Sequence, residues 1–337
     1  LASTHFWIGT LGIILYAIPM YWAAFRSYFM FKAFTPEGQL QYQFIDIVQT
    51  TVPFYIMRAV GGTVYLGGVL LMVYNLVKTA KKGTFAESEE AEAAPLTKTY
   101  VTTGKRFWHS VIERKPILLL VMSLFVVALG GIFELIPTFL IKSNIPTIAS
   151  VKPYTPLELQ GRDIYIREGC YNCHSQMIRP FRYEVMRYGE YSKAGEFVYD
   201  HPFQWGSKRT GPDLAREGVI GGRMYKSNSW HFSHLLDPQS VSEGSVMPAY
   251  PWLFRRDLDI TSTNSKIHAM RMLGVPYEAG YEAKANDDLM AQADKIAANL
   301  KTEKIKISSK KEIIALIAYL QRLGTDIQGE QKSALNK

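Results

Sequence analysis

The sequence predicts an all-α fold in which a membrane part with three transmembrane helices precedes a soluble helical domain. Three apolar stretches in the first 141 residues reach the length of about twenty residues that a helix needs to cross a bilayer. After them, the apolar residues follow helical rather than alternating spacing wherever a pattern is visible. The composition agrees, because 47% apolar and 13% aromatic residues lie between the values of soluble and membrane proteins.

The three expected spans are Phe6–Phe25, Ala59–Val77 and Pro116–Ile141. A buried core helix is the alternative for each, but such helices are shorter and amphipathic. The densest loading of basic residues separates the second span from the third, at Lys78, Lys81, Lys82, Lys98, Lys105, Arg106, Arg114 and Lys115. The positive-inside rule places this side in the cytoplasm, so residues after 142 are expected on the outer side of the membrane.

The segment 83–98 is small, acidic and poor in aromatic residues, which favours a linker. This linker is either a joint between two ancestral subunits or a plain cytoplasmic loop, and its composition fits both. We therefore expect two helices in residues 1–80, a cytoplasmic linker in 81–110, an anchor helix in 111–145 and a soluble domain in 146–337.

Both cysteines of the chain lie in one motif, Gly169-Cys-Tyr-Asn-Cys-His174. A Cys-x-x-Cys-His run is the attachment signature of a c-type haem, in which both thiols form thioethers and the histidine binds the iron. A structural zinc site needs about four ligands, and a disulfide framework needs dispersed cysteines. A thioredoxin-like pair is the remaining alternative, although it needs a βαβ context and no adjacent histidine. The motif predicts covalent haem on Cys170 and Cys173, with His174 as an axial ligand.

Met247 is the candidate for the sixth iron ligand among twelve methionines. It lies in the loop Gly244-Ser-Val-Met-Pro-Ala-Tyr-Pro251, whose two prolines cannot continue a helix. A thioether raises the haem potential relative to a second imidazole, which suits electron delivery to a strong oxidant. The alternative is a methionine exposed on a surface loop.

The His174 imidazole needs a hydrogen-bond acceptor that fixes its tautomer. The candidate acceptor is the carbonyl of Pro212, in the turn Thr210-Gly-Pro-Asp-Leu214. Four basic residues in this part of the chain either pair with haem propionates or form a surface that steers an acidic donor, and the sequence leaves both open: Arg179, Arg182, Lys208 and Arg209.

Two helices are expected to bracket the motif. Residues 156–169 lead into it, and residues 311–323 carry an amphipathic stripe that Gly324 ends. A cytochrome c fold requires two such helices to cross, and Gly161 and Tyr319 are the expected contact residues.

Three joined motifs now resemble a known family. The segments 168–180, 205–216 and 245–253, behind an anchor helix, are similar to the mono-haem cytochrome c subunit of cbb3-type cytochrome c oxidases, over residues 110–327. Residues 1–80 resemble the last two helices of the catalytic subunit of the same haem-copper enzymes, through the runs that begin at His5 and Met57. This order implies a fusion protein of which the chain is the C-terminal part.

The resemblance implies a proton-pumping terminal oxidase of the bacterial respiratory chain, which reduces O2 to water in the cytoplasmic (inner) membrane. Its haem b, high-spin haem b and copper B would be held by upstream helices, so His5 is not carried over as a metal ligand. The periplasmic cytochrome domain would pass electrons to haem b. Its partners would be the rest of the catalytic subunit, a di-haem cytochrome c subunit, a soluble or membrane cytochrome c donor and the lipid bilayer. The resemblance also implies a calcium ion near Ser207.

Two other functions are weighed against this one: the cytochrome c subunit of a nitric oxide reductase, and a membrane-anchored electron carrier without an attached enzyme. The two spans ahead of the anchor helix favour the oxidase. Nucleic acid is not an expected partner, because much of the net charge of +8 flanks the spans. Glu134 has either a proton-path or helix-contact role, or simple interfacial solvation.

Overall fold

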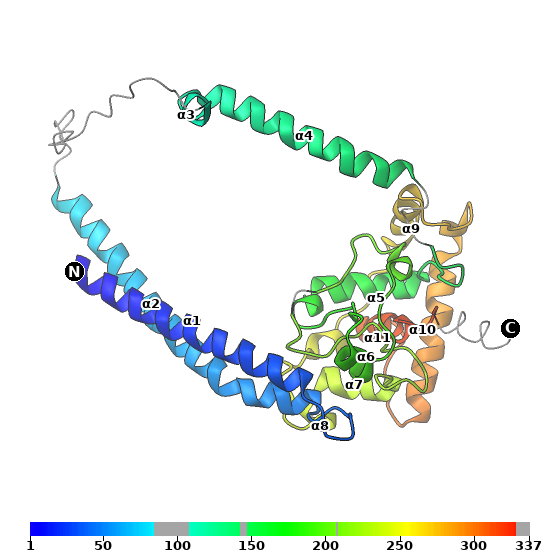
Figure 1. Cartoon of the computed structure of the whole chain (residues 1–337). Coiled ribbons are helices and arrows are strands. Elements are labelled where there is room, and N and C mark those ends of the chain that lie inside the picture. The colour runs from blue at the N-terminus through cyan, green and yellow to red at the C-terminus, as the bar shows by residue number, and fades with distance from the viewer. Residues whose placement is uncertain (84–107, 142–146, 207, 328–337) are drawn as a thin grey trace. The chain divides into compact units, whose positions relative to one another are not determined.

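The computed structural model describes residues 1–83, 108–141, 147–206 and 208–327, and within these ranges the fold is helical with no β-strand (Figure 1). The expected linker falls largely on residues 84–107, and the expected calcium neighbour is Ser207. Both lie outside the described residues.

Three helices are long and apolar enough to cross a membrane, as the sequence predicts. They are α1 (Ala2–Lys32), α2 (Phe44–Lys82) and α4 (Pro116–Leu140), the last preceded by the short α3 (Trp108–Glu113). The first two exceed the expected spans, since α1 continues past Arg26 and α2 begins well before Ala59. Backbone hydrogen bonds extend a helix beyond its apolar stretch, and long basic side chains can carry their charge to the membrane surface.

The chain divides into two compact units, each described here by itself. One comprises Leu1–Phe6 with Gly68–Pro146, and the other comprises Trp7–Gly67 with Thr147–Lys337. In the second unit α1 and α2 approach closely at two glycines. A Cβ added to Gly12 would lie 2.5 Å from the Tyr65 nitrogen, and one added to Gly61 would lie 2.6 Å from the Leu15 carbonyl carbon. Small residues allow such backbone contact between membrane helices.

The soluble domain is built on the crossing of α5 (Pro156–Arg167) and α11 (Glu312–Arg322). A capping box between Thr155 and Glu158 begins α5. A Cβ on Gly161 would lie 1.9 Å from the Ala315 carbonyl oxygen and 2.8 Å from Cβ of Tyr319. The predicted contact between Gly161 and Tyr319 is therefore confirmed, and only glycine permits so close an approach.

Five further α-helices belong to this domain within the described residues. They are α6 (Arg182–Tyr188), α7 (Asn228–Leu236), α8 (Pro238–Val241), α9 (Thr263–Met272) and α10 (Ala285–Thr302). Residues 313–320 of α11 are all buried, and α10 packs against α5, α7, α9 and α11. The body of α5, which leads into the motif, thus belongs to the buried core, whereas its last residue, Arg167, is exposed.

Candidate functional site

The Cys-x-x-Cys-His motif forms a tight turn directly after α5. Gly169 has a φ of 72°, a left-handed conformation that suits glycine, and the 3₁₀ turn Cys170–Asn172 follows it. The backbone nitrogens of Cys173 and His174 both donate to the Cys170 carbonyl, at 3.1 and 2.9 Å. One turn therefore fixes the relative positions of both thiols and the imidazole.

The two cysteines differ in their surroundings. Cys170 is half-buried and packs against the α5–α11 core, whereas Cys173 is exposed. Burial, reinforced by the Glu168 carboxylate, raises the pKa of the Cys170 thiol to about 12. A thioredoxin-like nucleophile needs a lowered thiol pKa. The thioredoxin-like alternative is therefore disfavoured.

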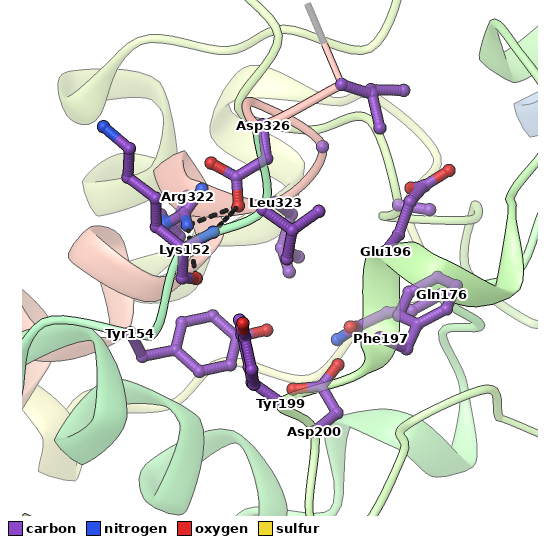
Figure 2. Close-up of a pocket in the computed structure, with 14 residues that line it drawn as sticks. Lys152, Tyr154, Gln176, Glu196, Phe197, Tyr199, Asp200, Arg322, Leu323 and Asp326 are labelled. Atoms are coloured by element: carbon purple, nitrogen blue, oxygen red, sulfur yellow. Dashed lines mark hydrogen bonds and ion pairs between the residues drawn. The ribbon is translucent and has the colours of Figure 1, made fainter. Parts of the chain in front are cut away.

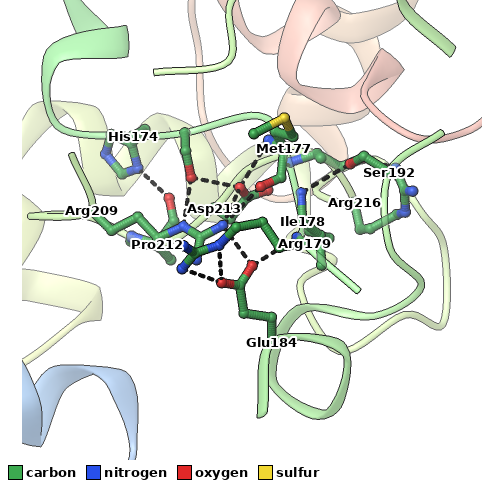
Figure 3. A network of polar contacts seen from close by, with 12 residues as sticks. His174, Met177, Ile178, Arg179, Glu184, Ser192, Arg209, Pro212, Asp213 and Arg216 are labelled. Carbon is green, nitrogen blue, oxygen red and sulfur yellow. Dashed lines mark hydrogen bonds and ion pairs between the residues drawn. The ribbon is translucent and has the colours of Figure 1, made fainter. Parts of the chain in front are cut away.

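The His174 ring is held from one side by the turn that contains Pro212. Its Nδ1 lies 2.9 Å from the Pro212 carbonyl oxygen, which is the contact expected from the sequence (Figure 3). A Cβ on Gly211 would lie only 2.2 Å from Cε1 of the ring. Desolvation lowers the pKa of His174 despite the carbonyl, so the imidazole is neutral. Donation from Nδ1 then leaves the Nε2 lone pair for a metal.

Asp213 fixes the Pro212 turn against the motif, as Figure 3 shows. Its buried carboxylate accepts bonds from the Ser175 hydroxyl at 2.5 Å, the Met177 nitrogen at 2.9 Å and the Ala215 nitrogen at 2.9 Å. Four acceptor positions on one carboxylate allow this arrangement. Asp213 therefore determines where the Pro212 carbonyl meets His174.

A second carboxylate, Glu184 on α6, extends this network. It accepts a bond from Nη2 of Arg209 at 2.9 Å and from Nε of Arg179 at 2.5 Å. Arg209 also lies 3.2 Å from Asp213. Burial alone would raise the pKa of Glu184, but the two guanidiniums outweigh burial and lower it. Glu184 is therefore charged, and it couples α6 to the His174 side of the site.

The Met247 loop and the tryptophan that follows it are tied to α7 and to the residue before the motif. Met247 is half-buried and packs against the same core cluster as Cys170. The Tyr250 nitrogen donates to the Leu235 carbonyl on α7 at 2.9 Å, and Nε1 of Trp252 donates to the Glu168 carboxylate at 2.9 Å. The structure thus joins the Met247 loop to the residue that precedes the motif.

Helix α7 adds a histidine that the sequence did not single out as a site residue. His234 is half-buried and stacks on Trp230 with ring centroids 4.4 Å apart. Burial and the nearby His174 lower its pKa to about 4. Its Nδ1 is shielded from solvent and makes no hydrogen bond within the described residues. An uncharged imidazole with an unpaired nitrogen therefore lies beside the predicted ligand.

The predicted basic residues do not act as one group. Arg179 and Arg209 both pair with Glu184, whereas Arg182 donates to the Gly38 carbonyl at 3.0 Å. Their predicted pairing with propionates stays a prediction. The sequence did not single out Asp213, Glu184 or Trp252 as functional residues. Asp213 carried a signal as part of the Gly-Pro-Asp turn, and Trp252 carried one as part of the segment 245–253.

A separate polar cavity of about 40 Å³ lies between the start of α5 and the end of α11, lined by Tyr154, Asp200 and Arg322 among others (Figure 2). Inside the fold, Nε of Arg162 lies 3.5 Å from the Asp200 carboxylate, and burial raises the pKa of Asp200 to about 6. Small-molecule sites usually occupy about 300 Å³ or more. The cavity therefore suits water rather than a cofactor.

The fold and site define a helical protein with candidate membrane spans and a domain built around a Cys-x-x-Cys-His turn. Residues 109–327 match the family described as cytochrome c oxidase, mono-heme subunit/FixO. This match covers more than half of the chain, so the protein belongs to that family. The family is mono-haem by description, which implies a haem cofactor.

The chain is also similar to curated oxidase subunits. It is 45% identical over 83 residues to a bacteroid cytochrome c oxidase subunit 1 homolog from Bradyrhizobium diazoefficiens, covering 25% of this chain and 15% of that protein. It is 38% identical over 95 residues to a cytochrome c oxidase subunit 1 homolog from Agrobacterium tumefaciens, covering 28% of this chain and 18% of that protein. It is 32% identical over 91 residues to the cbb3-type cytochrome c oxidase subunit CcoN1 from Stutzerimonas stutzeri, covering 27% of this chain and 19% of that protein.

The chain spans less than a fifth of the length of each of these relatives. Together, the two kinds of match confirm the resemblance to a cbb3-type oxidase that the sequence motifs carried. The residues of this turn and its surroundings fit a haem. The neutral His174 has Nε2 free for iron, and both thiols share its turn.

Proposed function

We propose that this chain is the electron-entry part of a cbb3-type terminal oxidase of the bacterial respiratory chain. The proposal rests on two contacts in a chain of the mono-haem oxidase family. His174 lies against the Pro212 carbonyl, and Trp252, just after the Met247 loop, is bonded to Glu168 beside the motif. Electrons from a c-type donor or a di-haem subunit would enter here and pass to haem b of the catalytic subunit, which reduces O2 to water and pumps protons.

In this proposal Cys170 and Cys173 would hold the haem covalently, and His174 and Met247 would bind its iron. The haem supplies a one-electron Fe(II)/Fe(III) couple. Pro212 orients His174 by accepting from Nδ1, and Asp213 holds Pro212 in place. The thioether of Met247 would favour ferrous iron and so raise the potential. The half-buried packing of Met247 would limit the access of water to the bound group.

The proposed organisation follows the two kinds of match. Residues 1–80 are the last two helices of the catalytic subunit, 111–145 anchor the cytochrome domain and 146–337 form it on the periplasmic side of the inner membrane. The matches to catalytic subunits extend over 83–95 residues, as such a segment requires. Haem b, high-spin haem b, copper B and the calcium ion would belong to the assembled complex.

The test uses the membrane complex purified on this chain. Reduced-minus-oxidised spectra with pyridine-haem analysis should show haems c and b, and an oxygen electrode should show cyanide-sensitive uptake. Consumption of nitric oxide without oxygen uptake would replace the proposal by the reductase. Haem c alone, with neither activity, would replace it by an electron carrier.

A further inference from the structure

The turn between α1 and α2 meets α6 of the soluble domain inside one compact unit (Figure 1). This turn, residues 33–43, is tied internally by bonds from the Thr35 nitrogen to the Gln39 carbonyl at 2.9 Å and from the Gln41 nitrogen to the Ala33 carbonyl at 3.1 Å. Gly38 has a φ of 79° at its tip. The turn therefore has a defined shape that another surface can recognise.

Arg187 is the most buried contact between this turn and α6. It is 9% exposed, its Nη1 donates to the Tyr42 carbonyl at 3.0 Å, and its guanidinium lies 5.2 Å from the centroid of the Phe31 ring. Burial lowers the pKa of Arg187, so its charge is costly to desolvate. A carbonyl acceptor and an aromatic face offset part of that cost. Both partners come from the hairpin of α1 and α2, so the hairpin determines the environment of Arg187.

Arg182, at the start of α6, repeats this pattern at the tip of the turn. Its Nη2 donates to the Gly38 carbonyl at 3.0 Å, and its guanidinium lies 4.7 Å from the Phe34 ring centroid. Each arginine therefore combines one carbonyl and one phenylalanine of the hairpin. Since the guanidinium is planar, lysine cannot reproduce both contacts.

Apolar packing and a third contact extend the same surface. Phe44, the first residue of α2, packs against the buried cluster of Ile178, Tyr188 and Ala215. A Cβ on Gly244, in the Met247 loop, would lie 1.7 Å from Nε2 of Gln49 on α2. The hairpin therefore meets both α6, which carries Glu184 of the His174 network, and the loop that carries Met247.

We propose that α6 and Gly244 form a docking surface that holds the soluble domain on the α1–α2 hairpin without help from the linker, with Arg187 as its anchor. The partner is the end of α1 with the turn that follows it, which together offer carbonyls and phenylalanine faces. The inference rests on the proposed function in one respect, because it takes the hairpin to be the catalytic-subunit part. Docking at α6 would then fix both sides of the haem site relative to the catalytic helices.

The experiment inserts a specific protease site between Ala91 and Glu92 of the full chain, with an affinity tag after Lys337. The purified complex is cut, and the N-terminal fragment that stays on the resin is measured. Most of it should remain bound. In the double variant Arg182→Ala/Arg187→Ala the retained fraction should fall about tenfold or more, as the loss of two desolvated polar contacts predicts. Arg255→Ala, an exposed arginine on the same domain, is the control.

Arg187→Lys keeps the positive charge and alters the side chain less than alanine does. It therefore tests the role of Arg187 even if the double alanine variant misfolds. It should retain less N-terminal fragment than the control while the haem spectrum stays unchanged. Separation of the unsubstituted fragments on cutting would overturn the proposal, and so would full retention in both variants. Haem staining of the same fractions tests the proposed function separately, because association without haem would refute the cytochrome assignment and leave the docking surface standing.

Discussion

The two candidate iron ligands are held in different ways. Buried charged groups hold the surroundings of His174, whereas a few loop contacts hold Met247. Around His174, two buried carboxylates accept bonds from five residues in two segments of chain, 175–179 and 209–215. Around Met247, the loop is tied by the Tyr250 backbone and the Trp252 indole, and Met247 itself is only half-buried. The difference indicates that the imidazole is positioned by the fold, whereas the thioether is positioned by a loop that can adjust.

The largest effect is expected for Asp213→Asn. This change leaves Arg209 without one of its carboxylate partners inside the fold. Removing one member of a buried ion pair costs about 3–5 kcal/mol. The unfolding temperature of the complex should fall and less haem-stained chain should accumulate. Asp257→Asn, whose carboxylate is 72% exposed in a pair with Lys311, should cost less than about 1 kcal/mol. Equal losses in the two variants would contradict the comparison.

Gly211→Ala should come next. The added Cβ would overlap the His174 ring, so the ring must move away from the Pro212 carbonyl. Overpacking of this kind costs about 1–3 kcal/mol. The visible spectrum should show altered axial ligation. Gly62→Ala, where a Cβ meets nothing within 4 Å, should leave the spectrum unchanged. A native spectrum in Gly211→Ala would show that the ring position is not fixed by this turn.

Glu217→Gln tests a contact that joins the two sides. Glu217 follows the Pro212 turn, and its carboxylate lies 3.8 Å from His231 of α7. Burial raises the pKa of Glu217 to about 8, although Lys226 opposes the shift. The raised pKa means that the Glu217 carboxyl holds its proton more tightly in the folded state than in the unfolded state. The contribution of Glu217 to stability is therefore present at low pH and is lost as pH rises toward 8.

The glutamine variant should therefore lose less thermal stability than the native chain between pH 5 and pH 8, by several degrees. Melting curves of both proteins across this range measure the difference. Glu243→Gln, at an exposed carboxylate, should leave the pH dependence unchanged. Parallel curves for Glu217→Gln and the native chain would mean that Glu217 does not titrate in this window.

Trp252→Phe should have a smaller effect on the Met247 side. It removes one hydrogen bond to Glu168 and keeps most of the apolar surface. Such a bond contributes about 0.5–1.5 kcal/mol. The haem potential should become more sensitive to mild denaturant, because the loop is less firmly held. Trp205→Phe, at a tryptophan that is 53% exposed, is the matched control. A loss as large as that of Asp213→Asn would reverse the comparison.

Met247→His should change stability least and the potential most. An imidazole in place of the thioether lowers the potential, while haem stays attached through Cys170 and Cys173. Potentiometric titration measures the shift. Met272→His, at a methionine that is 71% exposed, should leave the potential unchanged. An unaltered spectrum and potential in Met247→His would show that Met247 is not the ligand.

The local parts of this architecture could be predicted from the sequence. The spans follow from apolar length, the two bracketing helices from their periodicity, and the contact of Gly161 with Tyr319 from the helix crossing. The early start of α2 could not be predicted, because Phe44 begins the helix where tertiary packing supports it. The contacts of Arg182 with Gly38 and of Trp252 with Glu168 join distant segments, and no periodicity reports such pairs.

The proposed function depends first on one covalent haem on Cys170 and Cys173, with His174 and Met247 as its iron ligands. A haem-stained denaturing gel of the purified chain, beside Cys170→Ala and Cys173→Ala, tests it most directly. We expect a stained band at the size of the native chain that is lost in both variants. An unstained native chain, or normal staining in both cysteine variants, would contradict the account.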